Sequence, residues 1–167
     1  MEIRRIAPTD DAAAAGRIVQ DAYFRLPDYP RDDEYDALLG DIDGRGDEAE
    51  VIVAVDEGRI VACLTYLPLM VGEHHAEFDD ADAASFRFFG VDPSVQGRGV
   101  GDAMVQWVID ESRRRGRRRI RIHTLESMPG AQRLYERIGF VRTPEHDENW
   151  DGIIGLAFVL EVGPATV

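Results

Sequence analysis

The chain has 167 residues, 44% of them hydrophobic, and a formal net charge of −13 at pH 7. This length allows a sizeable core, so we expect residues 1–167 to form a single domain. The acidic balance argues against nucleic acid or an anionic membrane as the main partner, because both bind to basic surfaces. The chain has 19 arginines and no lysine, which excludes chemistry that needs a lysine, such as Schiff-base formation.

The cysteine content and the hydrophobic pattern indicate the compartment. Cys63 is the single cysteine and cannot form an internal disulfide bond, which is typical of a reducing cytoplasm. The basic residues near the N-terminus are not followed by an apolar segment, and no apolar run is long enough to span a bilayer. We therefore expect a cytoplasmic protein without a membrane partner.

The first half of the chain predicts one strand, one or two helices and three further strands. A short strand at 2–7 precedes a helix that has Thr9 as its expected N-cap and acidic residues in its first turn. This helix ends near Phe24, and the acidic segment after it has room for a second short helix. Two β-branched runs joined by Glu-Gly-Arg predict a hairpin. This hairpin and the strand after it are expected at 51–56, 60–71 and 85–91.

The second half alternates helices with strands. A helix with one continuous apolar face ends near Arg115, and the alternating segment 118–125 is an expected strand. Ser127 followed by Pro129 predicts the start of a further helix, with Ser127 as its cap, and Gly139 ends it. Two final strands are expected at 140–143 and 152–162, with a loop between them. This order predicts an α/β domain with a mainly antiparallel sheet and one strand–helix–strand crossover.

Three glycines, Gly97, Gly99 and Gly101, lie between the expected strand at 85–91 and the helix after it. Glycines allow backbone amides to approach an anion closely, and a helix N-terminus adds unpaired N–H groups with a partial positive charge. The loop 96–102 is therefore a candidate phosphate or pyrophosphate site, although a turn without a ligand has the same composition. The P-loop is excluded because there is no lysine, and the dinucleotide fingerprint is excluded by the glycine spacing.

Two segments together resemble the GCN5-related N-acetyltransferase (GNAT) family. The first, Gln96-Gly97-Arg98-Gly99-Val100-Gly101 after Val91-Asp92-Pro93, is similar to the family's Gln/Arg-x-x-Gly-x-Gly/Ala loop. The second, about 30 residues downstream, contains Ala131, Leu134-Tyr135-Glu136 and Gly139-Phe140 and is similar to the family's A-x-x-L-Y-E-x-x-G-F segment. The resemblance implies a single central, mostly antiparallel mixed sheet of about seven strands flanked by about four helices, an α/β (α+β) fold.

The resemblance also implies a reaction and a cofactor site. In this family an amine attacks the thioester of acetyl-CoA directly, without a covalent enzyme intermediate. Strands 85–91 and 118–125 would splay apart to admit the cofactor. The backbone of Phe89, Gly90 and Val91 would pair with the pantetheine arm and polarise the acetyl carbonyl. The pyrophosphate would be held by the amides of Gln96, Gly97, Arg98, Gly99, Val100, Gly101 and Asp102.

Tyr135 falls on the position of the family's general acid, which protonates the departing thiolate. A phenol has a reference pKa near 10 and a thiol one near 8.5, so the transfer is uphill by roughly 2 kcal/mol. A positioned hydrogen bond can still accelerate the reaction by roughly 10²–10⁴-fold. The alternative is a core tyrosine, since Tyr135 shares an apolar helix face with Ala131, Leu134 and Ile138.

Two positions depart from the family pattern. Met128 lies where many members carry an asparagine, which puts one cofactor contact in doubt, and Ser85 lies where many carry a glutamate base. No His, Cys or Asp grouping has metal-ligand spacing, so we expect no metal. Replacement bases could come from the acidic loop before the strand at 85–91 or from a histidine; the candidates are Glu77, Asp79, Asp80, Asp82, His74, His75 and His123.

The distribution of charge bears on the partners. Seven arginines lie within 113–121, where cations stabilise a helix C-terminus, and contact with the 3′-phosphate of CoA is the alternative. Arg98 is the better candidate for a phosphate contact because the loop carries it. Acidic residues gather at 28–36 and 73–82, segments that flank the acceptor pocket in this family. With Tyr23, Tyr29 and Tyr35 they favour a small amine or polyamine over a protein amine.

Three hypotheses follow. The first is an acetyl-CoA-dependent N-acetyltransferase acting on a small-molecule amine. The second is a catalytically silent acetyl-CoA-binding or CoA-sensing module, suggested by Ser85 and Met128, and the third is an interaction protein in which the glycine loop is only a turn. Tyr135 and the intact loop favour the enzyme. The long apolar strand at 153–162 fits a monomer and a homodimer equally well.

Overall fold

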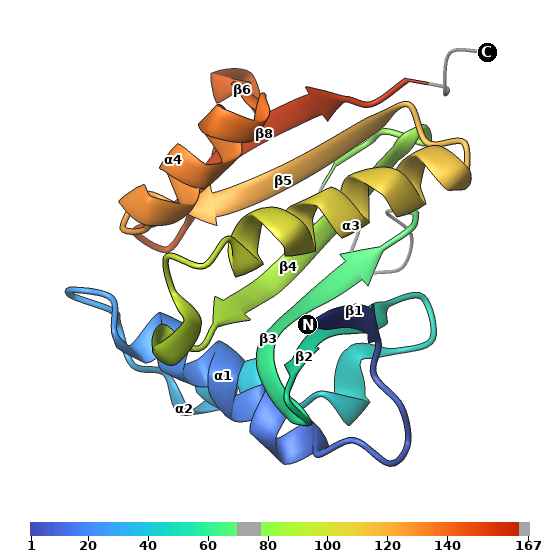
Figure 1. The fold of residues 1–167 in the computed structure, drawn as a ribbon. Helices are drawn as coiled ribbons and strands as arrows, with labels where there is room; N and C mark the ends of the chain where they lie inside the picture. The colour runs from blue at the N-terminus through green and yellow to red at the C-terminus, as the bar shows by residue number, and fades with distance from the viewer. Residues whose placement is uncertain (70–77, 164–167) are drawn as a thin grey trace.

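A computed structural model describes residues 1–69 and 78–163 of the chain (Figure 1). The four helices of these residues are α1 (Ala12–Phe24), α2 (Asp33–Gly40), α3 (Val100–Arg114) and α4 (Pro129–Ile138). The strands are β1 (Glu2–Arg5), β2 (Glu50–Asp56), β3 (Arg59–Leu67), β4 (Ala83–Val91), β5 (Arg119–Leu125), β6 (Val141–Arg142), β7 (Glu148–Trp150) and β8 (Ile153–Glu161). The expected strand at 60–71 therefore ends earlier, at Leu67, and its last two residues lie outside the described part.

The strands form one mixed sheet in the order β1-β2-β3-β4-β5-β8-β6, with β7 beside β8. Among the described residues, β4 and β5 are the parallel pair and the other pairs are antiparallel. This arrangement confirms the predicted fold class. The segment 148–150 is a correction, because it was expected in a loop and instead pairs with β8.

The two faces of the sheet carry separate apolar clusters, because successive side chains of a strand point to opposite faces. Ile52 and Leu64 belong to the cluster that includes the apolar residues of α3 and α4. Val53 and Cys63 belong to the cluster that includes those of α1 and α2. None of the helices in the described ranges is both long and apolar enough to cross a membrane.

The parallel pair β4–β5 is short. Its register comprises Ala83 opposite Arg119 and Ala84 opposite Ile120, after which the two strands diverge, as predicted. Phe88 lies in the diverging part of β4 and has φ of +52°, which is rare for a residue with a side chain. The register against β3 also shifts here, between Cys63 and Thr65. Such irregularities bend a strand and increase its twist, so they turn β4 away from β5.

Two helices begin at residues other than those predicted. Asp11, not Thr9, caps α1, because its carboxylate accepts a hydrogen bond of 3.0 Å from the amide of Ala14. The predicted cap Ser127 is also wrong. The N-cap of α4 is Met128, whose side chain makes no capping hydrogen bond, while Pro129 is the first helical residue as expected.

The close packing of α1 against β4 depends on a glycine in the strand. A Cβ atom at Gly90 would lie 2.7 Å from the carbonyl oxygen of Ile18 and 3.0 Å from Cα of Val19. Both are backbone atoms, which move only if the helix moves. Gly90 therefore sets the distance between α1 and the strand that borders the β4–β5 opening.

We predict that Gly90→Ala destabilises the protein by about 1–3 kcal/mol, because the new methyl group overpacks the α1–β4 contact. Differential scanning calorimetry should show a fall in Tm of roughly 2–4 °C for each kcal/mol lost. Gly130→Ala is the matched control. Gly130 lies in α4 with its nearest neighbour at 3.9 Å, so alanine there should stabilise by about 0.5–1 kcal/mol. Equal melting temperatures for wild type and Gly90→Ala would contradict the steric argument.

Candidate functional site

Two hollows lie where β4 and β5 diverge. The larger, here called the glycine-loop groove, has a volume of about 800 Å³ and runs between the glycine loop, the end of α1 and the start of α4. The smaller, here called the inner cavity, has a volume of about 90 Å³. Phe89, Met128 and Ala131 line both, so the groove and the cavity are neighbours.

The groove contains most of the residues predicted to bind a cofactor. Nine of the ten line it, namely Phe89, Gly90, Val91, Gln96, Gly97, Gly99, Val100, Gly101 and Asp102. Gly97 and Gly99 have φ of +81° and +79°, and a Cβ atom at either would meet nothing within 4 Å. Gly99 is the N-cap of α3 and provides no side-chain acceptor. The first amides of α3 therefore remain available at the groove.

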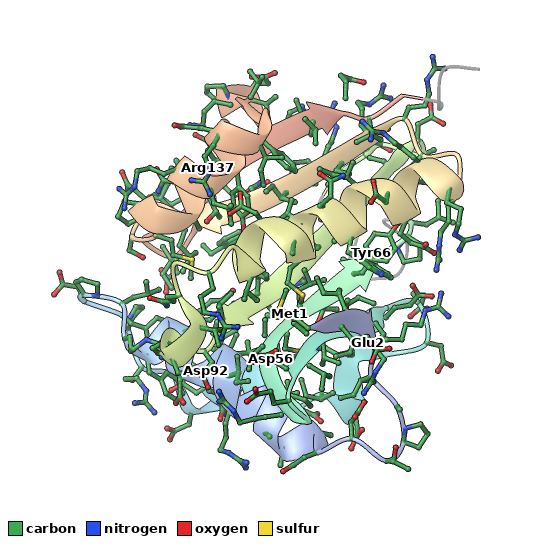
Figure 2. All side chains as sticks on the ribbon, viewed as in Figure 1. Met1, Glu2, Asp56, Tyr66, Asp92 and Arg137 are labelled. Atoms are coloured by element: carbon green, nitrogen blue, oxygen red, sulfur yellow. The ribbon has the colours of Figure 1, made fainter. Side chains whose placement is uncertain are left out.

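Arg98 is the predicted residue that does not line the groove. Its guanidinium pairs with Asp56 at the end of β2, with Nη2 and Oδ2 3.3 Å apart. Arg59 makes a similar pair of 3.1 Å with Asp92, at the start of the loop. Figure 2 shows Asp56 and Asp92 on the same side of the molecule as the start of α3. These two exposed pairs connect the loop to the β2–β3 hairpin.

Three arginines on the groove were missed in the sequence. Arg25 follows α1, whereas Arg133 and Arg137 lie on α4 and all three line the groove. Arg137 also pairs with Asp102 in the first turn of α3 at 2.9 Å. The spacing of Arg133 and Arg137, four residues apart on one helix face, was the signal that could have revealed them.

The arginine cluster 113–121 lies at the other end of α3, which is roughly 22 Å long for its 15 residues. Arg115 bridges Glu50 and Glu111 at 2.8 Å each. Arg114 and Arg115 lower the pKa of Glu111 to about 2 by hydrogen bonding to its carboxylate. The cluster joins α3 to the sheet and lies far from the glycine loop, so the described geometry favours its structural interpretation over contact with a phosphate.

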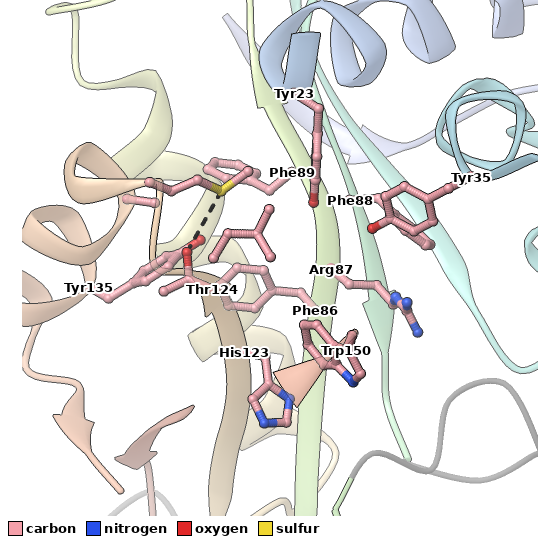
Figure 3. Close-up of a pocket in the computed structure, with 13 residues that line it drawn as sticks. Tyr23, Tyr35, Phe86, Arg87, Phe88, Phe89, His123, Thr124, Tyr135 and Trp150 are labelled. Carbon is pink, nitrogen blue, oxygen red and sulfur yellow. Dashed lines mark hydrogen bonds between the residues drawn. The ribbon is translucent and has the colours of Figure 1, made fainter. Parts of the chain in front are cut away.

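Tyr135 borders the inner cavity and is also part of the core. Its side chain is 5% exposed and its ring centroid lies 5.7 Å from that of Phe86 and 5.6 Å from that of Phe140. Burial alone raises its pKa well above the usual value, because no hydrogen bond or charge of a described residue contributes. Figure 3 shows the phenol beside Thr124, on the α4 side of the gap between the strands. The catalytic and core interpretations of Tyr135 are thus compatible.

Of the two departures from the family pattern, Met128 lines this cavity, whereas Ser85 is not among its described lining residues. Ser85 is 5% exposed on β4 and, as an alcohol, does not titrate near neutral pH. Met128 lines the cavity and its sulfur accepts a hydrogen bond of 3.8 Å from Oγ1 of Thr124, the dashed line in Figure 3. A thioether is a weak acceptor without a donor, so it cannot replace an asparagine amide.

The candidate replacement bases differ in their position relative to the inner cavity. His123 lines the cavity, and its Nε2 lies 2.8 Å from the carbonyl oxygen of His146. Asp80 is engaged by Arg119 and Arg121, which hold the pKa of its carboxyl far below the usual range. Asp79 and Asp82 are not among the described lining residues, and three further candidates, Glu77, His74 and His75, lie outside the described residues.

The expected acidic rim is not part of the described cavity wall. Asp36 accepts hydrogen bonds from Tyr29 at 2.8 Å and from Arg31 at 2.7 Å, which turns both side chains toward α2. Of the three tyrosines expected at the acceptor pocket, Tyr23 and Tyr35 line the cavity, whereas Tyr29 is not among its described lining residues. Within 1–69 and 78–163, no group of three or more histidine, cysteine or carboxylate side chains could hold a metal ion.

The sequence profile of the acetyltransferase (GNAT) family matches residues 15–140. This is well over half of the chain, so the chain belongs to the acetyltransferase (GNAT) family, and the predicted family is confirmed. Membership explains why the glycine loop, the divergent strands and α4 occur together in one fold.

Individual relatives agree with this assignment. A mycothiol acetyltransferase from Beutenbergia cavernae is 36% identical over 67 residues, which are 40% of this chain and 23% of that protein. The matched region spans about a quarter of the length of the curated relatives. A GNAT-family putative acetyltransferase from Desulfovibrio desulfuricans superimposes with a TM-score of 0.72 at 21% identity, over 97% of this chain and 99% of the other. A putative acetyltransferase from Salmonella typhimurium, solved with its cofactor acetyl-CoA, gives 0.66 at 20% identity, over 99% and 96%.

Cys63 is a nucleophile that could in principle carry an acyl group. It lies on β3 directly opposite Gly90 of β4 and is fully buried. Burial raises the pKa of its thiol to about 12, so the thiolate needed for nucleophilic attack is scarce at neutral pH. The geometry therefore argues against an acyl-cysteine intermediate.

We predict that the folded protein resists iodoacetamide at pH 8, whereas the urea-unfolded chain is alkylated at Cys63. With a folded pKa of about 12 against 9.0 for the free thiol, the thiolate fraction falls about a thousandfold on folding. Mass spectrometry of the intact chain measures the extent of alkylation. Rapid modification of the folded protein would show that Cys63 is reactive after all.

Proposed function

We propose that the protein is an N-acetyltransferase that transfers the acetyl group of acetyl-CoA to a primary amine, with a small-molecule amine preferred over a protein amine. One observation carries the proposal. The groove beside the glycine loop and the cavity beside Tyr135 meet at Phe89, where β4 has left β5. A thioester held in the groove would then reach the cavity from one side and an amine from the other.

The cofactor would bind along the groove. Amides at Gly97, Gly99 and the first turn of α3 would hold the pyrophosphate, with Arg133 adding positive charge. The edge of β4 beyond Ala84 has no partner strand in β5. Backbone groups of Phe89, Gly90 and Val91 would therefore pair with the pantetheine arm as an added strand does. Arg98 would act indirectly, through its pair with Asp56, by fixing the loop.

The chemistry would need little from side chains. Acetyl-CoA supplies a thioester that is already activated toward amines. A backbone amide near Phe89 would stabilise the negative charge that develops on the carbonyl oxygen. As the carbon–sulfur bond breaks, the hydroxyl of Tyr135 would donate its proton to the departing sulfur. Burial raises the pKa of Tyr135, so the phenol stays protonated at neutral and mildly alkaline pH. The same shift makes it a weaker acid, so its main contribution would be a hydrogen bond to the negative charge that develops on the sulfur.

The acceptor would have to lose a proton without a carboxylate at position 85. The described residues that line the inner cavity include no aspartate or glutamate. A weakly solvated site disfavours the charged form of a bound amine, which lowers its pKa. The neutral amine would then attack directly and release its proton to water, so that no dedicated base is required.

A catalytically silent module that binds acetyl-CoA or CoA is the second candidate. Ser85 and Met128 favour it, because both replace family residues with groups that cannot perform the same role. The cavity beside Tyr135 favours the enzyme, since a module that only binds the cofactor has no use for a second pocket at the thioester.

We predict that saturating acetyl-CoA stabilises the protein and that NAD does not. Ligand at 100-fold its Kd should add about 2.7 kcal/mol, a rise in Tm of roughly 5–10 °C for a chain of this size. Arg133→Ala should raise the Kd about three- to tenfold, since it removes one exposed charge from the groove. Arg114→Ala, which removes an equally exposed arginine at the other end of α3, is the control. No rise in Tm with acetyl-CoA would overturn both the enzyme and the module.

We predict that Tyr135→Phe lowers kcat by roughly 10²–10⁴-fold while the Kd for acetyl-CoA stays unchanged. Release of free CoA thiol, measured with an amine panel, reports turnover. Tyr66→Phe is the matched control, because Tyr66 is also a buried tyrosine of the same core but its hydroxyl bonds to Ser112. That variant should lose stability and keep its turnover per folded molecule. Undiminished turnover in Tyr135→Phe would remove Tyr135 from the mechanism.

A further inference from the structure

Two aromatic side chains that line the inner cavity, His123 and Trp150, contact each other. His123 stacks on Phe78 with centroids 4.5 Å apart and an interplanar angle of 13°. Trp150 contacts His123 edge-on, with the two ring centroids 5.3 Å apart and an interplanar angle of 80°. Figure 3 shows His123 and Trp150 next to one another where the cavity is lined by β5 and the β7–β8 hairpin. Here His123 and Trp150 are called the aromatic wall.

The hairpin holds Trp150 in a fixed position. Asp151 and Gly152 form its two-residue turn with φ of +56° and +92°, and the amide of Gly152 donates to the side chain of Asn149 at 2.7 Å. The indole lies close to Gly155 of β8, since a Cβ atom there would be 2.5 Å from Cη2 of Trp150. The absence of a side chain at Gly155 thus lets the ring pack against the backbone of β8.

Trp150 remains 41% exposed even though it lines the cavity. A large apolar side chain that is held rigidly and left partly open to solvent is typical of a binding surface. The cavity behind it holds about 90 Å³, which is space for about three water molecules. An aminoethyl arm fits that space, whereas any larger group on the same molecule has to remain at the mouth, beside Trp150.

We infer that the acceptor is an arylalkyl monoamine whose flat ring packs on Trp150 while its amino group enters the inner cavity. This inference rests on the proposed function and specifies the substrate class of the same site. A polyamine has no flat ring to pack on Trp150, so the aromatic lining of the inner cavity gives it no advantage over a simple alkyl amine.

The test compares two amines of matched size and different ring character. The Kd of 2-phenylethylamine and that of 2-cyclohexylethylamine are measured by isothermal titration calorimetry, with putrescine as the polyamine, on the protein with and without bound CoA. Packing of an aromatic ring on another should favour phenylethylamine about three- to tenfold. Turnover with acetyl-CoA is measured for the same three amines and should follow the same order in kcat/KM.

Variants in the β7–β8 hairpin test whether Trp150 causes the preference for the aryl amine. Trp150→Ala should abolish the preference for the aryl amine, and Trp150→Phe should retain most of it. Ile153→Ala is the matched control, because Ile153 is 37% exposed on the same hairpin and does not line the cavity. A melting curve of each variant shows that it is folded, and the acetyl-CoA Kd should be equal in all of them.

The outcomes distinguish failure of the arylalkyl acceptor class from failure of the proposed acetyltransferase function. Equal or reversed affinity for the two ring amines, tighter binding of putrescine, or a preference that survives Trp150→Ala each overturns the arylalkyl class and leaves the acetyltransferase proposal intact. Binding of none of the three amines also overturns it. Failure of acetyl-CoA to bind overturns the proposed function itself, while the amine titrations without CoA still decide whether the aromatic wall selects aryl groups.

Discussion

The two-residue parallel pairing of β4 and β5 is the constraint on which the rest of the site depends. Had the strands stayed paired along their length, their facing backbone groups would satisfy one another and no hollow would exist. Because pairing ends at Ala84, the edge of β4 beyond it has no partner strand in β5. Residues of α4 line the groove that forms there. The early end of this pairing and the irregular register of β4 against β3 are both features of the backbone, so the opening does not depend on one side chain.

The same opening explains why glycines gather around it for two different reasons. Gly97 and Gly99 adopt a left-handed backbone that opens amides toward the groove, whereas Gly90 is required by the close approach of α1. The conformation of Gly97 and Gly99 therefore matters mainly for ligand binding, whereas the lack of a side chain at Gly90 matters mainly for the stability of the fold. The sequence alone could not separate these roles, because it does not show which atoms lie close to each glycine in the folded protein.

Sequence reasoning recovered the features that depend on local pattern and on motif. The order of most elements and the sheet class followed from periodicity and from two family segments, and nine of the ten predicted cofactor-binding residues line the groove. The features it missed are of two kinds. Two are local, because α1 is capped by Asp11, two residues after Thr9, and the segment 148–150 pairs with β8 through a tight hairpin. The position of Arg98 depends instead on a distant contact, its pair with Asp56, 42 residues away along the chain.

The negative charge of the protein would attract any cation, whereas the aromatic lining of the inner cavity would favour particular acceptors. The cavity lining is therefore the more specific evidence about the acceptor. A net charge of −13 would attract amines to any part of the surface, so it cannot select among them. Under the proposed function, selection requires side chains near the acceptor nitrogen, and most of the described side chains that line the inner cavity are aromatic. If the acceptor is an amine, as proposed, the negative charge of the protein would raise the local concentration of ammonium forms, and the aromatic lining of the inner cavity would favour the neutral amine. Attraction and reactivity would thus be supplied by different parts of the same molecule.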